Sequence, residues 1–398
     1  MTLCPEITRR KGYDHMAVVS LQKCAQYDNQ ELKNKILAGL YQIEFDLAEL
    51  KNKRVCLKPN LLMPMSPERA VTTHPEVFRA VAEIVRDYTK DIVLIESPNI
   101  FPLKPTIKKA GLGGIIDDLK IEVADINITE TLRYDSANRY KHIDISKAFF
   151  DVDYIINMPK LKSHGFTNYT GAVKNLFGAM PGLSKSRMHM RAPSQMEFSQ
   201  FLLDLYGGLL NGFAKPKKFI HIMDAVIGME GEGPGPSGKP KKIGAIIVSD
   251  DAVALDYIAV SLIGLDVNKV FTVTEGFKRG YGVRSPDDIQ LKGEPLEAMR
   301  INDFKAPKSV VRGGGIWPLT SPIVKNLFVE KPVPKAAICT LCYNCLTVCP
   351  AGAIVKADQA KVPKYNYNQC IRCFCCMKTC QEAAIELKKG ILQWLMPT

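Results

Sequence analysis

The chain of 398 residues has a formal net charge of +12, with 46% hydrophobic and 24% charged residues. This balance excludes an intrinsically disordered chain, and the length suits two or three domains. No apolar run is long enough to span a membrane and no apolar signal segment starts the chain, so we expect a cytoplasmic protein without a membrane span. The positive charge suits an anionic ligand or an acidic protein. Nucleic acid is disfavoured, because no helix-turn-helix signature or aromatic-interleaved basic stripe is present.

Predicted strands and helices alternate along most of the chain. Residues 1–49 are polar and weakly patterned, and are predicted as an N-terminal extension with one helix near 29–49. Apolar residues at helical spacing in 74–88 contrast with short apolar runs such as 54–59, which are typical of buried strands. The alternation indicates an α/β fold, a mainly parallel sheet with flanking helices. The other predicted strands are 91–96, 121–126, 153–157, 218–224 and 243–249, and the other predicted helices are 104–119, 195–210, 251–263 and 267–280.

Two segments rich in glycine and proline interrupt this alternation. Residues 230–242 are predicted as a flexible loop between two strands, a position that either borders a site or is plain surface. Residues 304–334 lack periodicity and are predicted as a linker. The α/β domain is therefore placed at 50–303, and a separate C-terminal module at 335–390.

Polar side chains are concentrated just after the strand predicted at 153–157, in the sequence Asn-Met-Pro-Lys-Leu-Lys-Ser-His. Ligands of parallel α/β sheets bind at the carboxyl ends of the strands. Lysine and histidine at that edge can bind an anion or transfer protons, although a solvated turn with ordinary surface lysines is the alternative. We predict catalytic roles for His164, Lys174 and Lys162, and substrate-binding roles for Asn60, His74, Lys160 and His189.

One of these residues, His74, has a second interpretation. It lies at the start of the helix predicted at 74–88, for which Thr72 or Thr73 is the expected cap. In that case His74 is an ordinary residue of a helix start rather than part of a ligand site.

The cysteines are the strongest motif in the chain. Nine of the twelve lie in the last 60 residues, and eight of these form two Cys-x2-Cys-x2-Cys-x3-Cys sets that repeat with a period of 31 residues. The repeat indicates an internal duplication, and in a cytosolic chain such short spacings indicate metal binding rather than disulfides. The sets are Cys339, Cys342, Cys345 and Cys349, and Cys370, Cys373, Cys376 and Cys380.

This spacing predicts two 4Fe-4S clusters. Three cysteines wrap around one cluster, and the fourth of each set reaches the other cluster. Cys380 would therefore complete the first set and Cys349 the second. Zinc is the competing metal, because Cys-x2-Cys pairs also build zinc sites, but zinc needs neither the longer run nor its duplication. Cys375 breaks the spacing and is predicted to be a bystander.

Three family resemblances follow from these motifs. The C-terminal module resembles the bacterial two-cluster ferredoxins, which implies a small α+β fold and one-electron transfer at low potential. The larger domain resembles the family called domain of unknown function 362, which implies an architecture and no reaction. A fainter similarity to the nickel-pincer lactate racemases implies a pocket lined by His164 and Lys174. The segments similar to the domain of unknown function are Lys58-Pro-Asn60, His74-Pro75, Glu96-Ser97, Pro159–His164 and Gly171–Gly178, and the order shared with the racemases is His164, Gly171, Lys174, Pro181-Gly182 and His189.

Together these features predict an iron–sulfur oxidoreductase. Electrons from a redox partner protein, a ferredoxin or a reductase, would reach a small anionic substrate in the α/β domain, with His164 donating the proton and the lysines holding the anion. No Gly-x-Gly-x-x-Gly follows a strand, so a dinucleotide is not expected. Two alternatives stay open: an electron-transfer subunit that docks to a partner enzyme, and a non-redox isomerase with structural clusters. A further cofactor in the N-terminal pocket, such as a flavin or nickel, is also left open.

Overall fold

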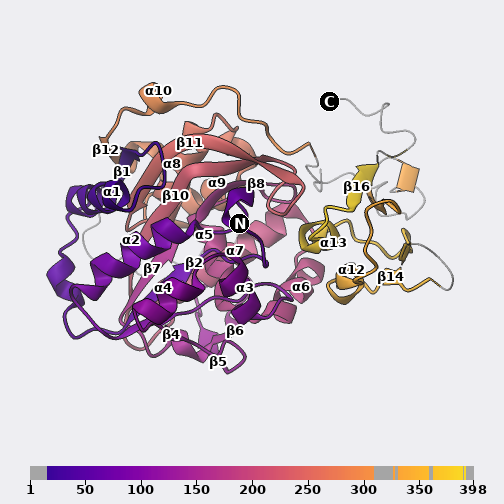
Figure 1. Cartoon of the computed structure of the whole chain (residues 1–398), viewed down its shortest axis with the longest axis horizontal. Helices are drawn as coiled ribbons and strands as arrows, with labels where there is room; N and C mark the ends of the chain where they lie inside the picture. The colour runs from indigo at the N-terminus through magenta and orange to yellow at the C-terminus, as the bar shows by residue number, and fades with distance from the viewer. Residues whose placement is uncertain (1–15, 309–325, 328–329, 358–361, 389, 391–398) are drawn as a thin grey trace, which may run out of the picture.

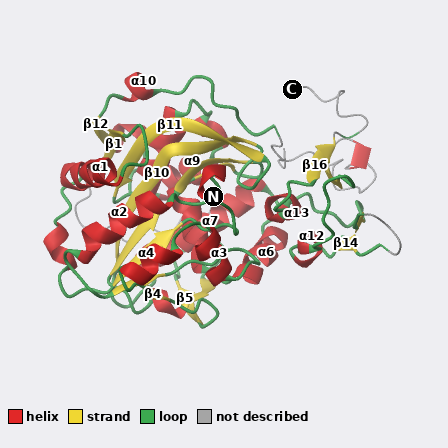
Figure 2. Ribbon diagram, viewed as in Figure 1, coloured by secondary structure: helices red, strands yellow, loops and turns green. Residues whose placement is uncertain are grey.

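The computed structural model describes residues 16–308, 326–327, 330–357, 362–388 and 390 (Figure 1). A ten-stranded sheet forms the centre of the larger domain. A small module with short strands and two short helices lies beside that domain (Figure 2). Within the described ranges, no helix has both the length and the apolar character needed to cross a membrane.

The sheet runs in the order β12-β1-β11-β10-β7-β2-β3-β4, with β8 paired to β10 and β9 paired to β8. Parallel pairs join β2 to β3 and β7, β7 to β10, and β1 to β12, whereas β11 is antiparallel to β1 and β10. The prediction of a mainly parallel sheet is confirmed. The strands are β1 (Ala17–Lys23), β2 (Val55–Pro59), β3 (Ile92–Leu94), β4 (Glu122–Val123), β7 (Tyr154–Met158), β8 (Lys160–His164), β9 (Asn168–Thr170), β10 (Lys218–Gly231), β11 (Gly238–Ser249) and β12 (Ile289–Gly293).

Helices cover both faces of the sheet, which explains why its central strands are buried at every position. In β2, Cys56 packs into the core under α7 and α8, and Leu57 packs into the opposite core under α1 and α2. The helices of the larger domain are α1 (Asn29–Gln42), α2 (Pro75–Arg86), α3 (Leu103–Lys109), α4 (Gly113–Asp118), α5 (Ala172–Asn175), α6 (Gly182–Arg191), α7 (Gln195–Asn211), α8 (Ala252–Leu262), α9 (Phe271–Arg279) and α10 (Leu296–Met299), and a separate hairpin is formed by β5 (Thr129–Arg133) and β6 (His142–Ser146).

Three segments differ from the sequence-based expectation. Residues 17–23, expected in the N-terminal extension, form β1 between β11 and β12. The helix expected at 104–119 is divided into α3 and α4, because Gly111 has a φ of 79° and ends the first of them. Most of the loop expected at 230–242 is strand, because β10 and β11 stay paired as far as Gly231 and Gly238.

The described residues of the C-terminal module from 330 onward form two short hairpins and two short helices. β13 (Lys331–Pro334) pairs antiparallel with β16 (Ile385–Lys388), and β14 (Ile354–Val355) pairs antiparallel with β15 (Lys364–Tyr365). The helices are α12 (Asn344–Thr347) and α13 (Cys375–Thr379). Next to α13, the module bonds to the larger domain: Asn99 Nδ2 donates to Thr379 Oγ1 at 3.0 Å, and Gln381 Nε2 donates to the Pro64 carbonyl oxygen at 3.3 Å.

Candidate functional site

Three of the candidate residues lie in a row on β8. Alternate residues of a strand point to the same face of the sheet, and Lys160, Lys162 and His164 occupy alternate positions of β8. The strand is held by parallel pairing with β10 and by antiparallel pairing with β9. The Lys-x-Lys-x-His spacing is therefore the sequence signal for this row, once the segment is known to be a strand rather than a turn.

The ring of His164 is held as a neutral imidazole. Its Nδ1 accepts hydrogen bonds from the backbone N–H groups of Phe166 and Thr167, at 3.0 and 3.1 Å. Burial, with the positive charges of Lys378 and Lys174 next, holds the pKa of His164 well below its usual value. The proton of the neutral ring must then be on Nε2. His164 is thus placed as a hydrogen-bond donor, and not as the acid that the sequence analysis expects.

Lys162 is better placed to transfer a proton. Its Nζ donates to Asn60 Oδ1 at 2.5 Å and to the Val71 carbonyl oxygen at 2.7 Å. Burial, followed by the charge of Lys160, lowers the pKa of Lys162 to about 7. A lysine with this pKa exchanges protons readily at neutral pH, which an ordinary lysine does not.

A buried carboxylate fixes the start of α5, the short helix that carries Lys174. Asp256 accepts hydrogen bonds from the backbone N–H groups of Ala172 and Val173, at 2.6 and 3.1 Å, and from Tyr169 Oη at 3.1 Å. Burial raises the pKa of Asp256 to about 7. Asp256 is therefore a positioning residue for the turn before Lys174.

Replacing Gly171 with alanine should lower the stability of the protein by about 1–3 kcal/mol or more. A Cβ atom at this position would lie 2.0 Å from Asp256 Oδ1 and 2.1 Å from Tyr169 Oη, so the turn before Lys174 would have to move. The midpoint of urea unfolding measures the effect. Gly114→Ala is the matched control, because its Cβ would meet nothing within 4 Å, and it should not lower the midpoint. Equal midpoints for the two variants would contradict this prediction.

The amine of Lys174 forms no ion pair with a carboxylate of the described residues. Within the described part of the chain it has neither a carboxylate nor a hydrogen-bond partner, and its Nζ lies 5.9 Å from the centre of the Phe177 ring. Burial, with the charge of Lys378 next, holds the pKa of Lys174 well below its usual value. Such an amine is available to an incoming anion.

Helix α6 adds three polar side chains to the same region. Lys185 Nζ donates to the Ser97 carbonyl oxygen, and burial lowers the pKa of Lys185 to about 8. His189 stacks on Phe198 with ring centres 4.4 Å apart. Among the described residues, neither Ser186 Oγ nor His189 Nδ1 has a hydrogen-bond partner, although both are buried. These two atoms are free to bind a ligand.

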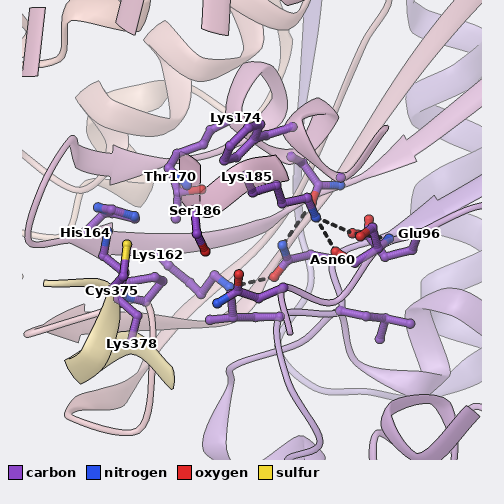
Figure 3. Close-up of a pocket in the computed structure, with 18 of the residues that line it drawn as sticks. Asn60, Glu96, Lys162, His164, Thr170, Lys174, Lys185, Ser186, Cys375 and Lys378 are labelled. Carbon is purple, nitrogen blue, oxygen red and sulfur yellow. Dashed lines mark hydrogen bonds and ion pairs between the residues drawn. The ribbon is translucent and has the colours of Figure 1, made fainter. Parts of the chain in front are cut away.

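The C-terminal module closes this site. Cys375 and Lys378 of α13 line a cavity of ≈ 90 Å³ together with residues of the larger domain. Figure 3 shows His164, Cys375 and Lys378 at one end of the cavity and Glu96 at the other. The site therefore lies between the two domains and is incomplete without α13.

The structure brings five of the seven predicted residues of the α/β domain together. The residues that line the cavity are Asn60, Lys162, His164, Lys174 and His189. The sequence analysis missed Glu96, Lys185 and Ser186, and it treated Cys375 as a bystander. Glu96 lies in a segment similar to the domain of unknown function, which is a usable signal. No local pattern points to Lys378, because its position depends on the docking of α13.

The other two predicted residues, His74 and Lys160, lie in a separate buried network. Lys160 Nζ donates to Asp224 Oδ2 at 2.7 Å and to Tyr27 Oη at 2.8 Å, because β10 places Asp224 opposite Lys160. The ring of His74 stacks on Tyr27 at 3.5 Å, and its Nδ1 accepts the backbone N–H of Glu76 at 3.2 Å. His74 therefore caps α2, a role that the sequence analysis assigned to the threonines before it.

The last cysteine of each set interacts electrostatically with thiols of the other set. Burial and the thiols of Cys342 and Cys339 raise the pKa of Cys380, the last cysteine of the second set. Burial and the thiols of Cys373 and Cys370 in the second set raise the pKa of Cys349, the last cysteine of the first set. Within the described ranges, no three cysteine, histidine, aspartate or glutamate side chains converge on the position of a single metal ion.

The backbone of the module repeats along with its cysteines. Leu341 and Tyr343, on either side of Cys342, have φ of 58° and 55°, and the equivalent Arg372 and Phe374 have φ of 60° and 55°. Left-handed conformations are uncommon outside glycine, so their repetition at matched positions marks the same loop shape in both halves.

Backbone N–H groups also point at the fourth cysteine of each set. Cys349 Sγ accepts a hydrogen bond from the Ala353 N–H at 3.3 Å, and Cys380 Sγ accepts one from the Ala384 N–H at 3.2 Å. Hydrogen bonds to sulfur are among the features that set the properties of iron–sulfur centres. The crossed thiols, the repeated loops and these bonds all fit iron–sulfur ligation.

The two halves of the module face different surroundings. Cys342 is exposed, and its neighbours Ile338 and Leu341 are 44% and 39% exposed. In the second half, Phe374 is 5% exposed. Helix α13 lies close to the turn between β10 and β11, because a Cβ atom on Gly235 would lie 2.8 Å from the Lys378 carbonyl oxygen. The second cysteine set therefore adjoins the cavity, whereas the first faces solvent.

Comparison with solved structures gives only distant similarity. The lactate racemase apoprotein from Thermoanaerobacterium thermosaccharolyticum aligns with a TM-score of 0.38 and 11% identity, over 61% of this chain and 57% of that chain. A protein from Thermotoga maritima aligns with a TM-score of 0.32 and 10% identity, over 56% of each chain. The chain thus spans less than two thirds of either structure.

Sequence comparison is more informative. Thylakoid-associated protein sll1697 of Synechocystis sp. is 29% identical over 297 residues, which cover 73% of this chain and 88% of that protein. The family model described as 4Fe-4S dicluster domain matches residues 331–381. The model described as domain of unknown function (DUF362) matches residues 55–261, more than half of the chain. The chain therefore belongs to the DUF362 family and has a 4Fe-4S dicluster domain on the C-terminal side of its DUF362 domain.

Proposed function

We propose that the protein is an iron–sulfur oxidoreductase that reduces a small anionic organic substrate in the cavity between its two domains. One observation carries this proposal. Helix α13 contains Cys376 of the second cysteine set, and the same helix places Cys375 and Lys378 in the cavity lined by His164 and Lys174. Helix α13 of the cysteine-rich module therefore forms part of the wall of the cavity that the candidate catalytic residues line.

The module has the ligands for its redox role. When bound, two 4Fe-4S clusters would supply single electrons at low potential. The ligands of one cluster are Cys339, Cys342, Cys345 and Cys380, and those of the other are Cys370, Cys373, Cys376 and Cys349. A redox partner protein, a ferredoxin or a reductase, is the electron source, and the exposed surface around Ile338 and Leu341 is where it makes contact.

The cavity residues supply a proton, a hydrogen bond and a binding group for the anion. Reduction of a carbonyl or carbon–carbon double bond takes up two electrons and two protons. Lys162 gives the first proton, which its pKa of about 7 allows, and water gives the second. The Nε2–H of His164 donates a hydrogen bond to the oxygen on which negative charge develops. Lys174 binds the anionic group of the substrate.

A non-redox isomerase is the second candidate. The observation that favours it is the same pKa of Lys162, because proton transfer at neutral pH requires no electron. The two candidates differ in the oxidised protein. An isomerase would exchange substrate protons with deuterated water in that state, whereas a reductase would be inactive until it is reduced.

Anaerobic stopped-flow measurement tests the proposed reductase. Holoprotein reduced by ferredoxin should regain its oxidised visible absorbance when pyruvate, oxaloacetate or fumarate is added as the acceptor. The Lys174→Met variant should be reduced as fast as the wild type and should be reoxidised at least about tenfold more slowly, because the ammonium group that holds the acceptor is missing.

Lys356→Met is the matched control for that experiment. Lys356 is a lysine of the C-terminal module, on the half that faces solvent. Its Nζ lies 5.0 Å from the centre of the Tyr343 ring. It should be reoxidised at the wild-type rate. Reoxidation by none of the acceptors counts against the reductase, and unchanged reoxidation of Lys174→Met favours an electron-transfer subunit whose DUF362 domain is a scaffold.

A further inference from the structure

Among the described residues that line the cavity, amines outnumber carboxylates. Four lysines line it, Lys162, Lys174, Lys185 and Lys378, against one carboxylate, Glu96. That carboxylate already forms a buried ion pair with Lys58, which lies just outside the cavity. Burying several amines without counter-charges is unfavourable for the protein alone. An arrangement of this kind suits a ligand that brings the missing negative charge.

Unpartnered polar atoms point to the same conclusion independently. Lys378 Nζ, Ser186 Oγ and His189 Nδ1 are buried, and within the described residues none of them has a hydrogen-bond partner. More than about 90% of buried polar groups in proteins have a partner, and Ser97 Oγ is a fourth atom without one in the lining of this cavity. The first three come from α6 and α13, which belong to different domains. Figure 3 shows Ser186 and Lys162 pointing toward the same space.

The cavity volume limits the size of the ligand, and the positions of the amines limit its shape. A volume of ≈ 90 Å³ admits only a compact molecule. Lys378 lies at the end of the cavity near His164, and Lys185 lies near Glu96, with 4.0 Å between Lys185 Nζ and Glu96 Oε1. A monocarboxylate has its charged oxygens on one carbon, whereas a dianion presents charged oxygens on more than one side and suits amines that approach from several directions.

We infer that the cavity binds a compact oxyanion with at least two negative charges, and that Lys378 of the dicluster domain is one of its ligand-binding residues. The inference deepens the proposed function, because it concerns the same cavity and rests on that assignment for its relevance to turnover. Small dicarboxylates and phosphate groups share this chemistry. Both present several acceptor oxygens to ammonium, hydroxyl and imidazole donors.

Isothermal titration calorimetry of oxidised holoprotein at pH 7 tests the inference without turnover. Oxalate, orthophosphate and acetate are the probes, and comparison of the first two separates the dicarboxylate from the phosphate source. At least one dianion should bind at least about tenfold more tightly than acetate, because it meets amines at both ends of the cavity. Lys378→Met should weaken binding of that dianion about tenfold or more.

Two further variants complete the experiment. Lys364→Met removes an exposed lysine of the same module and should leave dianion affinity unchanged. Ser186→Ala changes a residue outside the dicluster domain and should weaken binding several-fold, which keeps the inference testable if Lys378→Met loses its visible cluster absorbance. Equal affinity for acetate and both dianions overturns the inference, as does unchanged dianion binding by both Lys378→Met and Ser186→Ala.

The outcome is separable from that of the proposed function. Tight dianion binding without reoxidation by any acceptor upholds the inference and counts against the reductase. Reoxidation by an acceptor, with no dianion bound more tightly than acetate, overturns the inference and leaves the reductase standing.

Discussion

Replacement of Lys162 by methionine should lower kcat/KM for substrate reduction by about 10²–10⁴-fold, the usual contribution of a positioned proton donor. The visible spectrum and the rate of reduction by ferredoxin should not change, because the hydrogen bonds of Lys162 Nζ are to Asn60 and Val71 of the larger domain and not to a cysteine. Steady-state kinetics of the reduced holoprotein measure the loss.

The pH dependence of kcat/KM tests whether Lys162 is the proton donor. Burial and Lys160 lower the pKa of Lys162 to about 7, while Glu96 and Asp224 oppose them. The charge of Lys174 also acts on this amine, whose hydrogen-bond partners are uncharged oxygens. A lowered lysine pKa means that the ammonium form is lost as the pH rises through 7. Wild-type kcat/KM should therefore be highest below pH 7 and should fall about tenfold per pH unit above it.

The Lys162→Arg variant distinguishes the loss of a transferable proton from the loss of the positive charge. Arginine keeps a positive charge but does not release a proton at these pH values. Its residual activity should lack the alkaline decline of the wild type. If the decline persists unchanged in both Lys162→Met and Lys162→Arg, another group supplies the proton.

The largest effect on stability is expected from Lys58→Met. Lys58 and Glu96 form an ion pair in which neither side chain is more than 5% exposed, and Ser97 N–H adds a hydrogen bond to Glu96 Oε1 at 2.9 Å. Removing one partner of a buried pair costs about 3–5 kcal/mol, because the other charge is left without compensation. The midpoint of urea unfolding, followed by far-UV circular dichroism, should fall accordingly.

Two comparisons define the cause of that loss. The double variant Lys58→Met/Glu96→Gln should recover much of the stability, because it also removes the carboxylate that Lys58→Met leaves without its partner. Lys218→Met breaks the exposed pair with Glu49 and should cost less than about 1 kcal/mol. A double variant as unstable as Lys58→Met would show that packing, and not the buried charge, accounts for the loss.

Local patterns in the sequence were sufficient for much of the fold. The apolar spacing of 74–88 identifies α2, and the apolar runs at 54–59 and 153–157 identify β2 and β7. These predictions hold because the period of the side chains along a helix or strand is a property of a short stretch of backbone. The cysteine spacing is short-range in the same sense, so the 4Fe-4S dicluster domain was predictable from the sequence.

The same patterns were insufficient for the strands that pair far along the chain. β1 lies in a stretch that was predicted as an extension, although Ala17, Val18, Val19 and Leu21 are apolar, and its place in the sheet is set by its pairing with β11 and β12. The Gly- and Pro-rich segment at 230–242 has loop composition, yet its backbone groups are paired within a hairpin. Long-range pairing overrides local preference in strands more readily than in helices.

The candidate site shows the same division. Local spacing was enough to predict which residue types gather after β7, and it pointed to Lys162, His164 and Lys174 as candidates. Contacts between distant segments determine that Lys160 is neutralised by Asp224 on β10, whereas Lys162, two positions further along the same strand, faces a cavity. Only the docking of α13 added Lys378. Charge balance and cavity shape depend on contacts between segments distant in the chain, and no local spacing encodes them.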